Sequence, residues 1–193
     1  MTSASEFVDF KITVCGIEEL PGHSTVGVTH VLSILDPGME APPAFGAFGE
    51  HERLDLRFHD IVDDLPGMRP PLREDADSLL RFGRDLMREP KAHLLVHCHM
   101  GISRSTAAMT LVLAQARPDR SAADAMHEVA RIRSKAWPNL RLIELGDALL
   151  ERQGTLVAAA IERYRYSLAR RPELAEVMTG LGRAREVRSA AAG

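Results

Sequence analysis

A cysteine and an arginine six residues apart carry the clearest chemical signal in this sequence. Cys98 follows an apolar run at residues 93–96, which is typical of a buried strand, and Arg104 precedes an apolar run at residues 107–114, which is typical of a buried helix. The segment between them is therefore expected to be a tight loop. Such a loop can direct successive backbone N–H groups into one concavity, which the N-terminus of the following helix extends. The sequence thus predicts a site for an oxyanion such as phosphate.

The residue types in this loop suit phosphoryl transfer to sulfur. Converging N–H groups and a helix N-terminus stabilise a thiolate, so we expect Cys98 to be an ionised nucleophile. Arg104 supplies a planar fork that can hold two phosphate oxygens through the transition state. Gly101 permits the turn. Ser103 and Ser105 offer hydroxyls near the sulfur, and Ser105 is suited to stabilise the departing thiolate when the intermediate is hydrolysed.

Residues 97–105 read His-Cys-x-x-Gly-x-Ser-Arg-Ser. This segment resembles the signature loop of the cysteine-dependent protein tyrosine phosphatases, in the short form of the dual-specificity branch. The resemblance implies a two-step reaction through a cysteinyl-phosphate, with no metal and no cofactor, and it gives His97 a supporting role. The expected substrate-binding residues are His99, Met100, Gly101, Ile102, Ser103 and Arg104.

The same resemblance implies a general acid on the loop that follows a predicted strand at residues 53–60. The leaving oxygen must be protonated as its bond to phosphorus breaks, and a positioned carboxyl group can do this. Asp60 lies where the family pattern puts this acid, and Asp63 and Asp64 are alternatives on the same loop. Asn139 follows a basic stretch and a proline, as in dual-specificity relatives. It is a candidate to hold the signature loop or the attacking water, or to be a plain helix N-cap.

The order of strand and helix patterns predicts an α/β fold. We expect a central, mostly parallel sheet of about four to five strands flanked by helices, as in phosphatases, with extra C-terminal helices. Strand, helix and strand in succession favour a parallel pair, with Cys98 and Asp60 at one edge. The predicted strands are 7–15, 28–36, 53–60 and 93–96, and the predicted helices are 72–89, 107–117, 122–132, 140–153, 155–171 and 173–188.

Length and composition limit the class of protein. A chain of 193 residues with 45% hydrophobic residues can bury one good core. We expect a catalytic domain over residues 1–153 and a helical extension over residues 154–193 packed on the same domain. The extension could cap the fold or mediate dimerisation, and the oligomeric state stays open.

Charge and hydropathy patterns exclude several partners. The net charge is −3 and aromatic residues make up 5% of the chain, so no cationic nucleic-acid face is indicated. No apolar stretch has the length of a membrane span, and residues 1–6 lack the pattern of a secretory signal. Two cysteines cannot form a disulfide framework. We therefore expect a cytoplasmic protein without nucleic-acid or membrane partners.

The expected activity is hydrolysis of a phosphorylated protein or a small aryl phosphate. Leu-Val-Leu-Ala at residues 111–114 stands where the dual-specificity pattern has a tyrosine-containing segment, so substrate preference does not carry over. His99, Met100 and Ile102 occupy positions where lipid-directed relatives have lysines, which argues against polyphosphoinositides.

Two other functions use a similar loop. The first is a module that binds phosphorylated partners with little or no turnover. The second is a thiol-transfer or arsenate-reducing enzyme, which is disfavoured because Cys15 is the one cysteine left to resolve an intermediate. A protective disulfide between Cys15 and Cys98 under oxidation is a related alternative.

Overall fold

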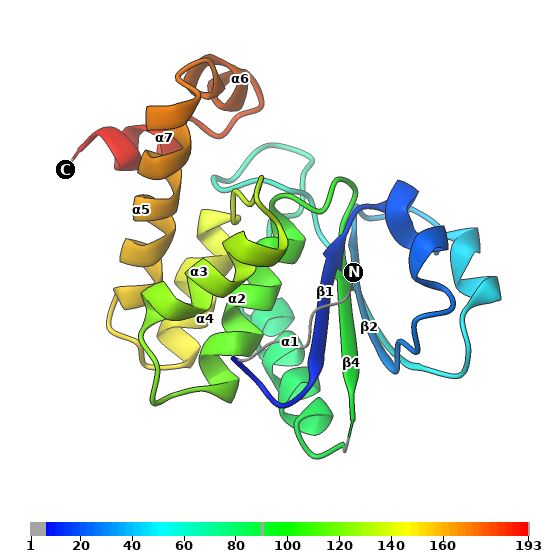
Figure 1. Ribbon diagram of the computed structural model, residues 1–193. Helices are drawn as coiled ribbons and strands as arrows, with labels where there is room; N and C mark the ends of the chain where they lie inside the picture. The colour runs from blue at the N-terminus through cyan, green and yellow to red at the C-terminus, as the bar shows by residue number, and fades with distance from the viewer. Residues whose placement is uncertain (1–6, 90, 193) are drawn as a thin grey trace.

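The computed structural model describes residues 7–89 and 91–192 and is built around a four-stranded sheet (Figure 1). All strand pairs are parallel, and the strand order is β1-β4-β2-β3. β2 and β4 are buried along their whole length, which explains their continuous apolar sequences. The predicted α/β fold is confirmed. The strands are β1 (Lys11–Cys15), β2 (His30–Leu35), β3 (Glu52–Arg57) and β4 (His93–His97).

β3 and β4 are not neighbours, contrary to the parallel pair favoured by the sequence. β2 lies between them, with Leu35 in register with Arg57 on one side and Ser33 in register with His97 on the other. The connection through α1 (Arg73–Leu86) therefore crosses over one strand. Because every strand is parallel, all four still end at the same edge of the sheet.

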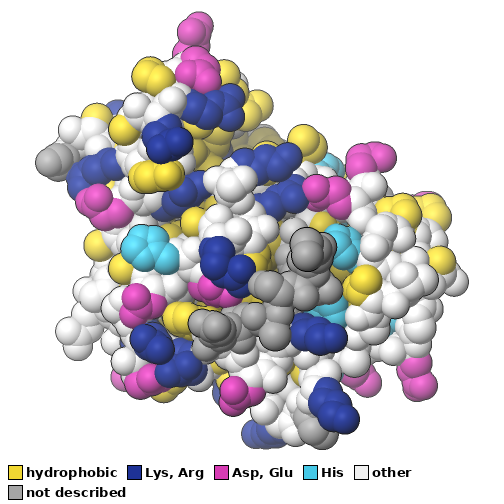
Figure 2. Space-filling view, in the orientation of Figure 1, with side chains coloured by type: hydrophobic (Ala, Val, Ile, Leu, Met, Phe, Trp, Pro, Cys, Tyr) yellow, Lys and Arg dark blue, Asp and Glu magenta, His cyan; other side chains and the backbone are white. Residues whose placement is uncertain are grey.

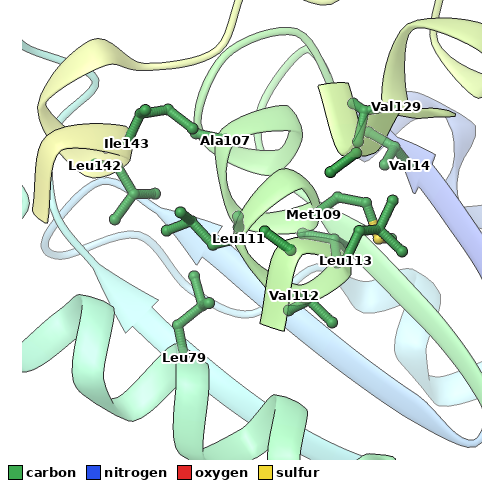
Figure 3. Packing of buried hydrophobic residues seen from close by; sticks show 14 of the residues in the cluster. Val14, Leu79, Ala107, Met109, Leu111, Val112, Leu113, Val129, Leu142 and Ile143 are labelled. Carbon is green, nitrogen blue, oxygen red and sulfur yellow. The ribbon is translucent and has the colours of Figure 1, made fainter. Parts of the chain in front are cut away.

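Helices α1 to α4 cover one face of the sheet (Figure 1). α2 (Arg104–Ala116) lies in the middle of this layer and contacts each of the other three helices. It is buried from residue 104 to residue 114, as its nearly uniform apolar sequence predicts. Figure 3 shows Leu111 and its neighbours on α2 packed among side chains of α1 and α4. The other two helices are α3 (Ala122–Ile132) and α4 (Leu140–Leu149).

The opposite face is covered by two short 3₁₀ helices, η1 (Ile17–His23) and η2 (Pro43–Ala47). Residues 36–52 show no helical period in the sequence, because a 3₁₀ turn is too short to produce one. Phe45 of η2 nevertheless packs in a small second cluster against Leu95 of β4.

Three further helices form an outer layer: α5 (Thr155–Arg170), α6 (Leu174–Gly180) and α7 (Ala184–Ala191). α5 contacts α3, α4 and α7. The prediction of one helix over residues 173–188 was wrong, because the chain turns at Gly182, where φ is +76°. α7 continues through Ala190, which is buried and accepts a hydrogen bond from Arg165 at 2.9 Å.

α6 and α7 lie beside the end of α5 that is closer to the carboxyl edge of the sheet (Figure 1). The boundary between residues 153 and 154 stays a prediction. Within the part of the chain that the structure describes, no helix combines the length and the apolar character needed to cross a membrane.

Candidate active site

Cys98 lies in a cleft of about 650 Å³ at the carboxyl edge of the sheet. It directly follows β4, is 3% exposed, and has its Sγ atom 3.2 Å from the Oγ atom of Ser105 in the first turn of α2. Arg104 and Asp60 line the same cleft. The structure thus brings together the three side chains that the sequence assigned to attack, phosphate binding and proton transfer.

The loop from β4 to α2 turns its carbonyl groups toward the protein scaffold. The carbonyl oxygens of residues 99–103 all accept hydrogen bonds, whereas none of the N–H groups of residues 99–104 has an acceptor within residues 7–89 and 91–192. These N–H groups are therefore left for a bound anion. Donors from outside the loop and α2 include Ile17 N to His99, the Arg133 guanidinium to Met100 and Gly101, Trp137 N to Ile102, and Asn139 N to Ser103. Within α2, the Thr106 hydroxyl also donates to Ile102 and Ser103, and Ala107 N donates to Ser103.

Gly101 is required at its position for two reasons. Its φ is +67°, in the left-handed region that favours glycine. A Cβ atom there would also lie 2.5 Å from the carbonyl carbon of Cys15 and 2.7 Å from an Arg133 nitrogen. The tight turn predicted from the sequence therefore also brings the loop against the end of β1.

One edge of the Arg104 guanidinium is anchored. Its Nη1 atom donates to Asp36 Oδ1 and to the carbonyl of Phe58, both at 2.6 Å. The buried Nε atom has no hydrogen-bond partner among the described residues, so the edge of the guanidinium that carries Nε is unengaged. Sequence reasoning missed Asp36. Its place directly after β2 was the available signal, because the carboxyl ends of parallel strands meet at one edge.

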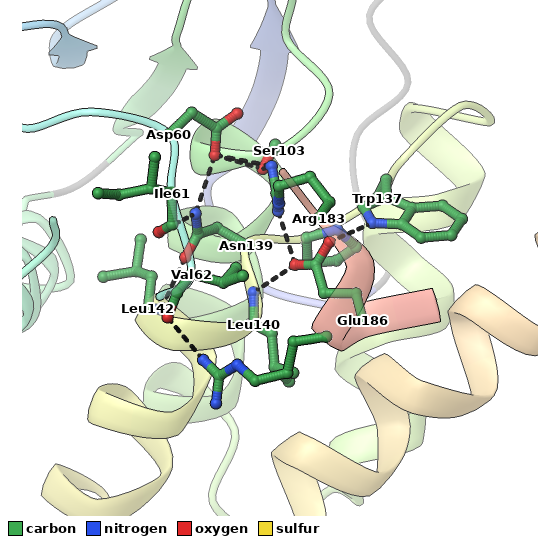
Figure 4. A network of polar contacts seen from close by, with 12 residues as sticks. Asp60, Ile61, Val62, Ser103, Trp137, Asn139, Leu140, Leu142, Arg183 and Glu186 are labelled. Atoms are coloured by element: carbon green, nitrogen blue, oxygen red, sulfur yellow. Dashed lines mark hydrogen bonds and ion pairs between the residues drawn. The ribbon is translucent and has the colours of Figure 1, made fainter. Parts of the chain in front are cut away.

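Three donors converge on one oxygen of Asp60 (Figure 4). Oδ1 accepts hydrogen bonds from Ser103 Oγ at 2.7 Å, from Asn139 Nδ2 at 2.8 Å and from Arg183 Nη1 at 3.0 Å. The other oxygen, Oδ2, points away from this network (Figure 4). Ser103, which was expected to offer its hydroxyl near the sulfur, uses it to hold the aspartate instead.

The two alternative acids on this loop have other partners. Asp63 pairs with Arg185 at 3.0 Å and Asp64 with Arg141 at 2.6 Å, and neither lines the cleft. Two of the roles left open for Asn139 by the sequence agree with its contacts. It accepts a hydrogen bond from the N–H of Leu142 as the N-cap of α4, and its own backbone N–H donates to the carbonyl of Ser103 in the loop. Its side-chain amide also donates to Asp60, which the sequence did not predict.

Two arginines of this site escaped sequence reasoning. Arg133 belongs to the basic stretch before Pro138, where its charge gave no hint that it would bind loop carbonyls. Arg183 lies between the last two helices, 80 positions after Ser103 in the sequence. No motif links it to the loop that follows Cys98. Arg133 is held by a salt bridge of 2.8 Å to Glu19.

Two histidines flank Cys98 in the chain. Burial lowers the pKa of His97 to about 4, so its ring is neutral at pH 7. The ring lies against Phe45, with centroids 5.4 Å apart. His99 has its Nε2 atom 3.9 Å from Asp36 Oδ2. Across residues 7–89 and 91–192, no group of three His, Cys, Asp or Glu side chains is arranged to bind a metal ion.

The C-terminal helices build the outer wall of the cleft. Its lining includes the basic residues Lys135, Arg163, Arg170 and Arg171, whereas Asp60 is the acidic residue that lines it. Lys and Arg side chains gather around these helices (Figure 2). Large apolar side chains are also exposed along the wall. They are Tyr166, Val177 and Leu181, each more than half exposed, and Met100 of the loop after β4 is exposed on the other side of the cleft lining.

Comparison with known proteins finds similarity in structure alone. No family model matches the sequence, and no curated protein matches it. Among solved structures, Tk-PTP in its active form has 24% identity and a TM-score of 0.53, covering 75% of this chain and 92% of that one. Human DUSP28 has 19% identity and a TM-score of 0.56, covering 73% and 94%.

A third similar structure is the human tyrosine phosphatase-like serine/threonine/tyrosine-interacting protein. It has 19% identity and a TM-score of 0.55, covering 77% of this chain and 95% of that one. In each case nearly the whole known structure is matched, while about a quarter of this chain lies outside the match. The chain therefore has the fold of the tyrosine and dual-specificity phosphatases.

Proposed function

We propose that this protein hydrolyses phosphoric monoesters through a cysteinyl-phosphate intermediate, as a protein tyrosine or dual-specificity phosphatase. One observation carries the proposal. A single cleft combines the Cys98 thiol, a loop whose carbonyl groups bind the scaffold and leave its N–H groups unengaged among the described residues, an anchored arginine, and an aspartate with one unengaged oxygen. The phosphatase fold of the similar solved structures supports the same conclusion.

In the first step, the N–H groups of residues 99–104 and the free edge of Arg104 bind the non-bridging oxygens of phosphate. The Cys98 thiolate attacks phosphorus, the S–P bond forms, and the P–O bond to the leaving group breaks. Asp60 gives its proton to the leaving oxygen. Charge that develops on the phosphoryl oxygens meets donors that are already oriented, and such preorganised donors are a major source of rate enhancement.

In the second step, a water molecule attacks phosphorus while Asp60, now ionised, accepts its proton. The S–P bond breaks, inorganic phosphate forms, and the sulfur leaves as a thiolate. The Ser105 hydroxyl, 3.2 Å from the sulfur, can donate a hydrogen bond to that charge. The scheme uses side chains, backbone groups and water, and it needs no metal or cofactor.

A phosphorylated protein or an aryl phosphate is the substrate that suits this cleft. Its apolar wall, formed in part by Trp137, Val177 and Leu181, can hold an aromatic leaving group beside Cys98. The basic residues further out would attract anionic parts of a protein substrate. Peptides that carry phosphotyrosine, phosphoserine or phosphothreonine are the substrates whose hydrolysis rates should be compared.

Hydrolysis of p-nitrophenyl phosphate and phenyl phosphate without added metal tests the proposal. The wild-type protein is expected to release phosphate, and Cys98→Ser is expected to be inactive. Asp60→Ala should be slowed more strongly on phenyl phosphate, because its poorer leaving group depends more on the acid. Asp64→Ala is a matched control, since Asp64 lies on the same loop outside the cleft, and its activity should stay at the wild-type level.

The same assay separates catalysis from binding. If the wild-type protein is inactive on both esters and on phosphopeptides but still binds vanadate, the hydrolase proposal fails and a phosphate-binding module replaces it. Activity that persists in Cys98→Ser would rule out the cysteine mechanism.

A further inference from the structure

Arg183 connects the C-terminal helices to the reacting groups of the cleft. It lies in the turn between α6 and α7, is 3% exposed, and directs one nitrogen into the site (Figure 4). Nη1 donates to Asp60 Oδ1 and to Ser103 Oγ, both at 3.0 Å. A single guanidinium nitrogen thus contacts both the predicted acid and the phosphate-binding loop.

The other end of the same guanidinium is fixed by a buried carboxylate. Nη2 of Arg183 donates to Glu186 Oε1 at 2.6 Å, and Glu186 is fully buried. Glu186 also accepts hydrogen bonds from Trp137 Nε1 at 2.6 Å and from the N–H of Leu140 at 2.9 Å. Both donors lie within two residues of Asn139, which itself binds Asp60. Arg183 is therefore held in one orientation from two sides.

Arg183 stays charged in this environment. Burial by itself would lower its pKa, but the carboxylates of Asp60 and Glu186 outweigh burial and raise the pKa above its ordinary value. A buried arginine with these partners can serve as a fixed cation beside the aspartate.

The three donors on Oδ1 decide which oxygen of Asp60 can carry a proton. An oxygen that accepts hydrogen bonds from Ser103, Asn139 and Arg183 has its lone pairs engaged, so in the acid form the proton belongs on Oδ2. Oδ2 is the oxygen turned away from the network (Figure 4). Proton transfer is efficient only when the acid is held in hydrogen-bonding geometry.

We propose that Arg183 is a positioning residue, and this inference rests on the proposed function. Arg183 comes from the C-terminal segment and holds the Asp60 carboxyl group so that Oδ2 is the oxygen that transfers the proton. The C-terminal helices are thus part of the catalytic apparatus. The same geometry serves the second step, when Oδ2 accepts a proton from water and the Arg183 cation stabilises the ionised carboxylate.

Kinetics of Arg183→Ala on two esters test this role. The quantity to compare is kcat/KM, which reports the steps up to formation of the intermediate and not its hydrolysis. With phenyl phosphate, which needs protonation of its leaving group, kcat/KM is expected to fall about tenfold or more, as a share of the roughly 10²–10⁴-fold that a positioned acid contributes. With p-nitrophenyl phosphate, the loss should stay within about threefold, because nitrophenolate leaves without much help. Arg183→Lys should recover part of the loss, and millimolar guanidinium should rescue Arg183→Ala where sodium chloride does not.

Arg165→Ala is the matched control. Arg165 binds the carbonyl of Ala190 at 2.9 Å and so helps to hold α7, but it does not contact Asp60 or Ser103. Loosening α7 through Arg165 should leave the ratio of the two rates unchanged. Thermal unfolding of each variant shows whether it is folded, and Arg183→Gln provides a second, less disruptive variant if Arg183→Ala is not.

A measurement that does not depend on turnover tests whether Arg183 holds Asp60, even if the protein is not a phosphatase. Hydrogen–deuterium exchange of residues 60–64 should rise in Arg183→Ala and stay at the wild-type level in Arg165→Ala. The positioning role is overturned if exchange is the same in both variants, or if both esters slow by the same factor without rescue. Failure of the wild-type protein to hydrolyse either ester would instead refute the phosphatase proposal, and exchange alone would then decide whether Arg183 holds Asp60.

Discussion

At the scale of single residues, the hydroxyl beside Cys98 has a definable task in the proposed mechanism. Ser105 Oγ lies 3.2 Å from Cys98 Sγ, and both atoms are buried. In the free protein this hydroxyl can donate to a thiolate, and during hydrolysis it can donate to the sulfur as the S–P bond breaks. Its effect should therefore be concentrated in the second step.

Ser105→Ala is expected to slow breakdown of the intermediate about 10–100-fold, since a hydrogen bond to a charged group contributes about 1.5–3 kcal/mol. Formation of the intermediate should be much less affected. Rapid-quench measurements with p-nitrophenyl phosphate should show a burst of nitrophenolate followed by a slow steady rate. A uniform slowing of both phases would contradict the assignment.

At the scale of elements, the loop between β4 and α2 is shaped by the scaffold around it. Five successive carbonyls are held by η1, by Arg133 and by the segment before α4, so the N–H groups face the cleft. The loop passes close to β1 at Gly101. Its geometry is therefore set by contacts from several parts of the chain.

Gly101→Ala should deform the loop. A left-handed alanine costs about 1–2 kcal/mol, and its Cβ would also overlap the carbonyl carbon of Cys15 at 2.5 Å. We expect lost stability, together with strongly reduced vanadate binding and activity. Gly27→Ala is a matched control, because Gly27 has a φ of +74° but open space around its Cβ position. Equal vanadate binding by the two variants would contradict a specific effect of Gly101 on the loop.

Local patterns predicted much of the fold and the centre of the site. The helix at residues 122–132 was predicted with its observed bounds, because Ser121 caps it and its apolar period is clear. The loop after Cys98 was predicted because its residues are adjacent in the chain. Asp36, Arg133 and Arg183 could not be assigned in the same way. Each acts through a contact made by the folded chain, and a single charged residue in a sequence is more often a solvated surface group.

At the scale of the whole molecule, buried histidines make stability depend on pH. The unfolded chain protonates His97 near pH 6.5, whereas burial lowers its pKa in the folded protein to about 4. The unfolded state therefore binds more protons between these values, and stability falls as pH falls. Burial also lowers the pKa of His23, His30 and His93, which act in the same direction.

Between pH 6.5 and 5, His97 alone should account for about 2 kcal/mol of lost stability. Urea unfolding at several pH values, compared between the wild-type protein and His97→Asn, measures this contribution. The variant should show a shallower decline over that range, whatever its stability at pH 7. If the free energy of unfolding declines equally with falling pH in the two proteins, His97 does not make this contribution.

The outer wall of the cleft should influence which phosphoproteins are preferred. Arg170 lines it and has its guanidinium carbon 5.5 Å from the Tyr166 ring. Arg170→Glu is expected to lower kcat/KM about three- to tenfold for a phosphotyrosine peptide with acidic neighbours, chiefly at low salt. A neutral peptide and p-nitrophenyl phosphate should be little changed.

Arg81→Glu serves as the control for Arg170→Glu, since Arg81 is an exposed arginine of α1 outside the cleft lining. The same loss with Arg81→Glu would indicate a general effect of net charge. In that case the wall would have no specific role in substrate choice.

The central claim is that phosphate is transferred to Cys98, and trapping the intermediate tests it most directly. Asp60→Asn should form the intermediate from p-nitrophenyl phosphate, whose leaving group needs little protonation, and should hydrolyse it slowly because the base is missing. Acid-quenched protein analysed by mass spectrometry is then predicted to carry one phosphoryl group on the peptide that contains Cys98. Turnover of the ester with no phosphoryl group on Cys98, or with the group on another residue, would contradict the mechanism.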